Sequence, residues 1–133
     1  DKVIRMCLIH DLGECFTGDI PTFDKTAADE NREEELLYNW VASLPAPFNA
    51  EMRALYDEMA ARETQEAKIY KALDNIEAVV QHNESDISTW VPLEYELNLT
   101  YGSDKAAFSP VMQALRDVVR EETLQKMAEH EQG

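Results

Sequence analysis

Apolar residues recur at helical spacing along most of this chain. Between residues 64 and 82, Ile69, Leu73, Ile76 and Val80 are separated by four, three and four positions, so one helix would carry them on a single stripe. A charged run followed by apolar residues predicts another helix over residues 27–44, ended by Pro45 and Pro47. Two more helices are expected, one with Asn49 as its N-cap and one beginning at Ser109-Pro110.

Residues 85–103 form the least regular part of the pattern. Their apolar residues alternate in part with polar ones, as in a strand, but the chain offers no second strand for pairing. We therefore predict a loop with short helical pieces there. The whole chain is expected to be all-α.

An apolar first helix ends in two residues that carry chemistry. Residues 3–9 are apolar except for Arg5, which predicts a buried helix, and His10-Asp11 follows directly. A histidine and a carboxylate brought into an interior need partners, which a metal ion would provide. An ordinary helix C-terminus, with His10 near the last carbonyls and Asp11 exposed, explains the pair equally well.

The next ten residues concentrate ionisable groups around turn-forming residues. Glu14 and Asp19 follow the His-Asp pair, Gly13 and Gly18 allow tight turns, and Pro21 discourages a helix. We predict an ordered loop leaving the first helix. Loops carried on rigid elements are where catalytic groups tend to lie.

The His10-Asp11 pair, Glu14, the segment around Asp19 and the later run Lys71-Ala72-Leu73-Asp74 resemble the motifs of the HD-domain metal-dependent phosphohydrolases. Within that superfamily the chain is most similar to the branch with the 5'-deoxynucleotidases. The resemblance runs from residue 1 to about residue 125 and fades after residue 84. It implies an all-α HD-domain helical bundle.

The resemblance also assigns roles to individual residues. It implies that His10, Asp11 and Asp74 bind one divalent metal ion, and that Glu14 and Asp19 are the catalytic carboxylates. Lys25 matches a lysine of some relatives and is a candidate for substrate binding, against the alternative of a surface lysine. The family's first histidine and a phosphate-binding arginine would precede residue 1. Oxygen and imidazole ligands suit Mn, Co, Fe, Ni, Zn or Mg.

Spacing alone leaves the role of Asp74 open. It lies about 100° from Leu73, on the flank of the apolar stripe, where small alanines would let another helix approach. It could equally be an exposed acid paired with Lys71 or Lys68. His82 and His130 are poor substitutes for a missing ligand, because the first lies about 12 Å along the helix from Asp74 and the second is in a polar tail.

Composition limits the other possibilities. At 133 residues the chain suits one domain, residues 1–133, which we expect to be an HD domain incomplete at its N-terminus. No segment resembles a membrane span or a signal peptide, and two cysteines do not make a disulfide framework. A cytoplasmic location is the default expectation.

The chain carries 12 basic and 27 acidic residues, a net charge of -15. Such a surface repels nucleic-acid polymers and anionic membranes, because binding to either depends on lysine and arginine. A small nucleotide remains compatible with it, since a metal and one or two cations can neutralise its phosphate. The resemblance further implies a homodimer.

We therefore predict a metal-dependent hydrolase that removes the 5'-phosphate from (deoxy)nucleoside monophosphates. Relatives with several metals that cleave cyclic dinucleotides need further histidines between the HD pair and the distal aspartate, and none lies between Asp11 and Asp74. The alternative is a non-catalytic helical binding or regulatory module with a degenerate HD metal site.

Overall fold

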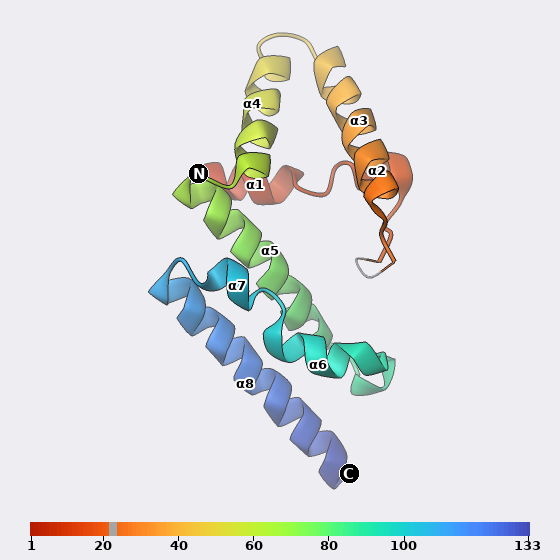
Figure 1. The fold of residues 1–133 in the computed structure, drawn as a ribbon, viewed down its shortest axis with the longest axis vertical. Helices are drawn as coiled ribbons and strands as arrows, with labels where there is room; N and C mark the ends of the chain where they lie inside the picture. Colours follow the sequence, from red (N-terminus) through yellow and green to blue (C-terminus); the bar gives the residue numbers. More distant parts are fainter. Residues whose placement is uncertain (22–23) are drawn as a thin grey trace. The chain divides into compact units, whose positions relative to one another are not determined.

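A computed structural model describes residues 1–21 and 24–133 of the chain. Over these residues the chain is helical with no strand, which confirms the all-α prediction (Figure 1). In chain order the elements are α1 (Lys2–Ile9), α2 (Glu14–Thr17), α3 (Ala27–Ser43), α4 (Phe48–Ala61), α5 (Gln65–Glu84), the 3-10 helix η1 (Ile87–Thr89), α6 (Pro92–Thr100), α7 (Ser103–Ala106) and α8 (Pro110–Gln132).

The chain divides into two compact units, Asp1–Ala67 and Lys68–Gly133. Unit 1 holds α1 to α4, and unit 2 holds most of α5 and everything after it. In unit 1, α3 and α4 form an antiparallel hairpin, α2 packs against α3, and α1 packs against α4 (Figure 1). Leu37 and Val41 are buried on α3, and Tyr56 and Met59 are buried on α4.

The start of α3 has a clear local cause. Thr26 has an extended backbone and its hydroxyl accepts the backbone N–H of Asp29, whose carboxylate in turn accepts the backbone N–H of Thr26. This reciprocal arrangement is a capping box, which satisfies two donors that a helix N-terminus leaves unpaired. It confirms the helix predicted over residues 27–44.

The N-cap predicted for α4 was wrong. The helix begins at Phe48 with Pro47 in the cap position, and the Asn49 side chain accepts the N–H of Ala50 at 2.8 Å from inside the first turn. Proline has a fixed φ that suits a helix start and needs no partner for a missing N–H. The helix can therefore begin before the residue whose side chain seemed better suited to capping it.

The prediction that α1 is buried was wrong for most of its surface. Met6 is buried, but Ile4 is 63% exposed and Leu8 is 75% exposed. Ile4 and Leu8 are four residues apart and share a helix face, whereas Met6 lies on another. A helix that packs on one side buries one face, so an apolar run does not by itself show burial all round.

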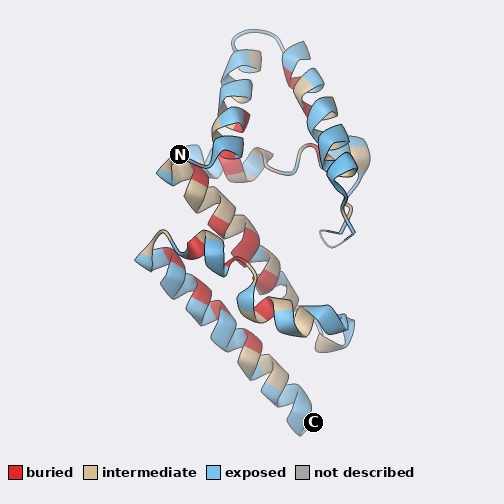
Figure 2. Ribbon diagram, viewed as in Figure 1, coloured by how far each residue is buried: buried red, intermediate tan, exposed pale blue. Residues whose placement is uncertain are grey.

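Unit 2 is built around the apolar stripe predicted on α5. Ile76 and Val79 pack with Val119 of α8, and Ala72 packs with Ala106 and Met112. Figure 2 shows buried positions along both α5 and α8. Partly buried hydrophobic residues pack against these clusters, and they include Ile69, Leu73 and Val80. The stripe is confirmed, and the Thr64 hydroxyl caps the helix by accepting the N–H of Ala67.

Residues 85–103 contain more helix than the predicted short pieces. The 3-10 helix η1 is followed by the nine-residue helix α6, which begins at Pro92, and by the short α7 from Ser103. Ser109 then caps α8 by accepting the N–H of Met112, with Pro110 as the first helical residue, as predicted. Val91, the N-cap residue of α6, and Leu93 are about half exposed while Asn98 is buried, so the apolar residues of this segment do not mark one buried face.

Polar side chains fasten α6 to its neighbours in unit 2. Arg116 of α8 is 3% exposed and donates from Nε to the Tyr101 carbonyl and from Nη2 to the Asn98 carbonyl, at 2.8 and 2.9 Å. His82 of α5 contacts the Asn98 amide oxygen through Nδ1 at 2.8 Å. Trp90, 7% exposed, donates its indole N–H to the His82 carbonyl at 2.9 Å. Arg116 thus provides hydrogen-bond donors for carbonyl groups at the C-terminus of α6, which a helix leaves without partners of its own.

Across the described residues, none of the helices combines the length and the apolar character that crossing a lipid bilayer would require.

Candidate metal and phosphohydrolase site

The His10-Asp11 pair lies where α1 ends in unit 1. His10 keeps helical backbone angles, and the hydrogen bonds Leu12 N–H to Ile9 carbonyl and Glu14 N–H to Asp11 carbonyl continue the turn into α2. Tyr56 of α4 donates its hydroxyl to the Ile9 carbonyl at 2.7 Å. The backbone next to the pair is therefore fixed by a contact from a residue 47 positions away.

The His10 ring is oriented by its own helix. Its Nδ1 lies within hydrogen-bonding distance of the Cys7 carbonyl, and a carbonyl can only accept, so Nδ1 carries the proton. The Nε2 atom lies 3.1 Å from Oδ2 of Asp11, with the His10 side chain 25% exposed and that of Asp11 61% exposed. In a neutral imidazole held this way, the lone pair of Nε2 faces a carboxylate oxygen.

Two facing electron-pair donors suit a cation between them. Nitrogen and oxygen ligands at about 2.1 Å from one divalent ion lie about 3.0 to 3.4 Å apart for adjacent ligand positions, and the observed separation falls in that range. The Cys7 carbonyl provides the outer contact that usually fixes the tautomer of a metal-binding histidine. The pair thus fits a metal ion, and an ion pair with a protonated His10 is the competing explanation.

Glu14 opens the short helix α2, one turn beyond Asp11. Partial burial raises the pKa of its carboxyl, and the negative charges of Asp11, Asp19 and Glu33 raise it further, while Lys25 acts against them. Glu14 therefore lies within electrostatic reach of three other acids and one lysine of unit 1. A carboxyl whose pKa is shifted by burial and by neighbouring charges is a candidate for a functional group.

Asp19 follows a forced turn and is exposed. Gly18 has a φ of +82°, which a side chain would strain, and its N–H returns to the Glu14 carbonyl at 2.7 Å. The predicted loop is therefore only partly a loop, because Glu14–Thr17 forms a helical turn before it. The glycine ends that turn and directs the chain toward Asp19.

Lys25 forms an ion pair that was not predicted from the sequence. Its Nζ lies 3.0 Å from Oε2 of Glu33 on α3, and both side chains are 18% exposed. Burial acts to lower the pKa of Lys25, but the hydrogen bond and the charge of Glu33 outweigh it, so the pKa is raised and the side chain stays charged. One signal was available, because Glu33 precedes the buried Leu37 and Val41 by four and eight positions and so continues their stripe.

Asp74 belongs to unit 2. Its carboxylate lies 3.2 Å from Nζ of Lys71 one turn earlier on α5, and both side chains are 28% exposed. Its negative charge also contributes to the raised pKa of Tyr101, which is caused mainly by burial. The pairing with Lys71 is the alternative that spacing left open, and it is compatible with a second role for the carboxylate.

Neither unit by itself, over residues 1–21 and 24–133, gathers three His, Cys, Asp or Glu side chains that could hold a metal ion. Unit 1 contributes the HD pair and unit 2 contributes Asp74, so the three-residue ligand set stays a prediction. The other histidines have the roles expected of them. His82 lies in the α6 network, 3.7 Å from Glu94, and His130 is exposed near the C-terminus.

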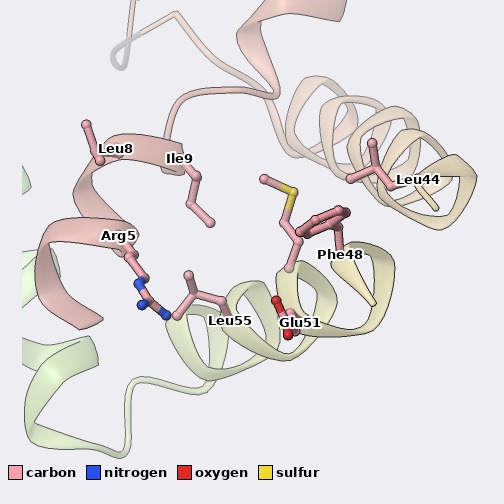
Figure 3. A pocket seen from close by; sticks show the side chains of 8 residues that line it. Arg5, Leu8, Ile9, Leu44, Phe48, Glu51 and Leu55 are labelled. Atoms are coloured by element: carbon pink, nitrogen blue, oxygen red, sulfur yellow. The ribbon is translucent and has the colours of Figure 1, made fainter. Parts of the chain in front are cut away.

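A groove of about 430 Å³ lies elsewhere on unit 1, between α1 and the α3–α4 hairpin (Figure 3). Arg5 and Glu51 are its charged residues, and the rest of its lining is apolar, namely Leu8, Ile9, Leu44, Phe48, Met52 and Leu55. None of the predicted site residues lines it. The candidate chemistry therefore lies on the turns that follow α1 and not in this groove.

Comparison with known proteins adds a family and a set of relatives. The family model described as HD domain matches residues 1–129. The 5'-deoxynucleotidase HDDC2 of Mus musculus is 36% identical over 86 residues, which are 63% of this chain and 43% of the mouse protein. The Homo sapiens protein of the same name is 35% identical over 86 residues, 63% of this chain and 42% of its own length.

A third relative matches this chain with similar identity and coverage. The 5'-deoxynucleotidase HDDC2 of Dictyostelium discoideum is 32% identical over 82 residues, 60% of this chain and 43% of that protein. The matched region is thus less than half of each curated relative. No solved structure matches the chain significantly.

Proposed function

Because the chain belongs to the HD domain family, we propose that it is a metal-dependent phosphohydrolase that releases the 5'-phosphate from (deoxy)nucleoside monophosphates. The substrate class is taken from the relatives, which are named 5'-deoxynucleotidases. The net charge of -15 supports a small nucleotide over a nucleic-acid polymer or a membrane surface.

One observation carries the proposal. Nε2 of His10 lies 3.1 Å from Oδ2 of Asp11 while Nδ1 faces the Cys7 carbonyl, a spacing that two ligands of one divalent cation would have. We propose that His10, Asp11 and Asp74 hold that ion, with Asp74 assigned by the family resemblance. When bound, the ion would supply Lewis-acid polarisation of the phosphoryl group. Mn, Co, Fe, Ni, Zn and Mg all suit these ligands.

The chain's own residues would do the rest. Asp19, exposed beyond the Gly18 turn, would assist the attacking water or protonate the departing sugar oxygen, and Glu14 would orient the water; the two roles could be exchanged. Lys25, kept charged by Glu33, would bind the phosphate.

Removal of a ligand tests the proposal. We expect Asp74→Ala to lose bound metal and phosphate release together, while His130→Ala, in the exposed tail, keeps both. Metal content would be measured by plasma mass spectrometry, and phosphate release with deoxynucleoside monophosphates. An Asp74→Ala protein that retains its metal would remove Asp74 from the ligand set.

A second candidate function is a non-catalytic helical module with a degenerate metal site. The Lys71–Asp74 ion pair favours it, because an aspartate paired on its own helix needs no ion. Equal metal binding by the protein and by its Asp74→Ala variant, together with no release of phosphate, would support this module over the enzyme.

Three further properties belong to the proposal. We expect residues 1–133 to act as one domain, the protein to form a homodimer, and its location to be cytoplasmic. Light scattering of the purified protein would measure its mass, and a monomer at micromolar concentration would contradict the homodimer.

A further inference from the structure

We propose that Glu33 of α3 is the positioning residue of the candidate site, through its contacts to Thr17 and Lys25 on either side of the segment that carries Asp19. This inference rests on the proposed function, because the segment matters through Asp19 and Lys25. Neither the relatives nor the family match assigns a role to Glu33.

Each oxygen of the Glu33 carboxylate has a different partner. Oε1 accepts from the Thr17 hydroxyl at 3.3 Å, and Oε2 accepts from Lys25 Nζ at 3.0 Å. Thr17 ends α2, and Lys25 directly precedes the Thr26 cap of α3. A single carboxylate therefore joins the residue before the Gly18 turn to a residue eight positions later.

The stem of the same side chain packs against a third point. A Cβ atom built on Gly13 would lie 2.7 Å from Cγ of Glu33, closer than real contacts allow. Gly13 has ordinary helical angles, φ -57° and ψ -30°, so space and not backbone conformation requires a glycine there. The turn between Asp11 and Glu14 thus packs directly against the Glu33 side chain at Gly13.

The position of Glu33 on α3 explains why it can hold these contacts. Leu37 and Val41, 8% and 1% exposed, lie one and two turns further along the same face and fix that face of the helix. Glu34 and Glu35, its neighbours in sequence, are exposed. Of three consecutive acids, only Glu33 lies on the packed face.

A charge between buried neighbours has electrostatic consequences. Glu33 is one of the acids that raise the pKa of Glu14, and it holds Lys25 charged against the effect of burial. Its contacts to Lys25 and Thr17 offset the cost of placing a further carboxylate near Glu14. Glu33 therefore fixes where Lys25 lies and favours its charged form.

The first experiment measures order without requiring catalysis. In amide hydrogen exchange, we expect Glu33→Ala to increase the exchange rate of peptides covering residues 14–21 about tenfold or more, with Glu34→Ala unchanged. Gly13→Ala should have the same effect as Glu33→Ala, because its methyl group displaces the Glu33 stem. Unchanged exchange in both variants would overturn the proposal.

The second experiment measures function. Glu33→Gln keeps the shape of the side chain and the contact to Thr17 but removes the ion pair, so we expect KM for a deoxynucleoside monophosphate to rise about tenfold with kcat changed less. Glu33→Ala should also lower kcat, since Asp19 loses its fixed position. Glu34→Gln and Glu35→Gln are the matched controls and should change neither constant.

The two experiments separate two kinds of failure. A protein without nucleotidase activity whose residues 14–21 lose protection in Glu33→Ala refutes the proposed function and retains the positioning role. An active protein whose Glu33→Gln and Glu33→Ala variants keep both constants and full protection refutes the positioning role alone.

Discussion

Polar groups serve different purposes in the two units. Unit 2 contains the buried polar residues found in the described part of the chain, which are Asn75, Asn98, Arg116 and Thr123. Among the candidate-site residues of unit 1, the side chains of Lys25, His10 and Asp11 are 18%, 25% and 61% exposed, Glu14 is partly buried and Asp19 is exposed. Among the described residues, full burial of a polar side chain therefore occurs away from the proposed site residues of unit 1.

The physical reason is the cost of changing a buried contact. Arg116 holds two backbone carbonyls, and Asn83 joins α5 to α8 through the Val119 carbonyl and the Thr123 hydroxyl. Loss of one of these bonds would leave a buried donor or acceptor without its partner, which costs free energy. The carboxylates proposed as catalytic, Glu14 and Asp19, would have to exchange protons and admit a substrate, which suits their partly solvated turn.

The largest effect expected from this contrast is on turnover. Glu14→Gln and Asp19→Asn should each lower phosphate release about a hundredfold or more, with little change in stability or metal content, because their contacts matter mainly in the transition state. Asp24→Asn, an exposed acid of the same segment, is the control. Full activity in Asp19→Asn would refute its catalytic role.

The largest effect on stability is expected in unit 2. Arg116→Met keeps most of the aliphatic stem but leaves the Asn98 and Tyr101 carbonyls without their donor, and should reduce the free energy of unfolding by about 3 kcal/mol. Arg120→Met, on the same helix and 47% exposed, should change it by less than about 0.5 kcal/mol. Denaturant unfolding would measure both, and equal effects would contradict the assigned role of Arg116.

A smaller effect is expected at the start of α3. Thr26→Ala removes the hydroxyl that accepts the Asp29 N–H and should cost about 1 kcal/mol of stability. Thr100→Ala, an exposed threonine at the end of α6, should be close to neutral. The same denaturant titration compares them, and a neutral Thr26→Ala would show that the cap contributes nothing.

The smallest effect is a pH dependence of the same cap. Hydrogen bonds from the backbone N–H and the hydroxyl of Thr26 hold the pKa of Asp29 below its ordinary value. The contribution of the Asp29 carboxylate to the free energy of unfolding is therefore fully present above its unfolded pKa of about 3.8. It is lost as the pH falls through the lower pKa of the folded state. Melting temperatures should differ between the protein and Asp29→Ala near pH 6 and converge near pH 2.

Most helices of the fold could be predicted because their signals are local. Thr64, Ser109 and Pro110 mark helix starts that the structure confirms, and the stripe from Ile69 to Val80 lies in the core of unit 2. The exposure of Ile4 and Leu8 could not be predicted, because it depends on which face of α1 meets α4. The start of α4 differed by two residues, because Pro47 and not Asn49 takes the N-cap position.

Only those residues of the candidate site that belong to a recognisable sequence motif could be predicted. His10, Asp11, Glu14 and Asp19 lie within ten residues, so a short pattern connects them. The Glu33 contact to Lys25 spans eight residues around a turn and arises only when α3 packs beside α2. The role of Asp74 as a ligand stays a prediction that rests on the resemblance.

The two tryptophans give the protein a built-in optical reporter for each unit. Trp40 is 37% exposed on α3, with Phe16 of α2 6.3 Å away, and Trp90 is 7% exposed beside Tyr95 in unit 2. Indole emission shifts to longer wavelengths with exposure to water, so Trp40 should emit further to the red than Trp90. In Trp40→Phe the remaining fluorescence follows unit 2, and in Trp90→Phe it follows the helix that carries Glu33. Thermal unfolding of each variant, followed by its remaining tryptophan and without any label, would therefore show whether unit 1 and unit 2 unfold together or one before the other.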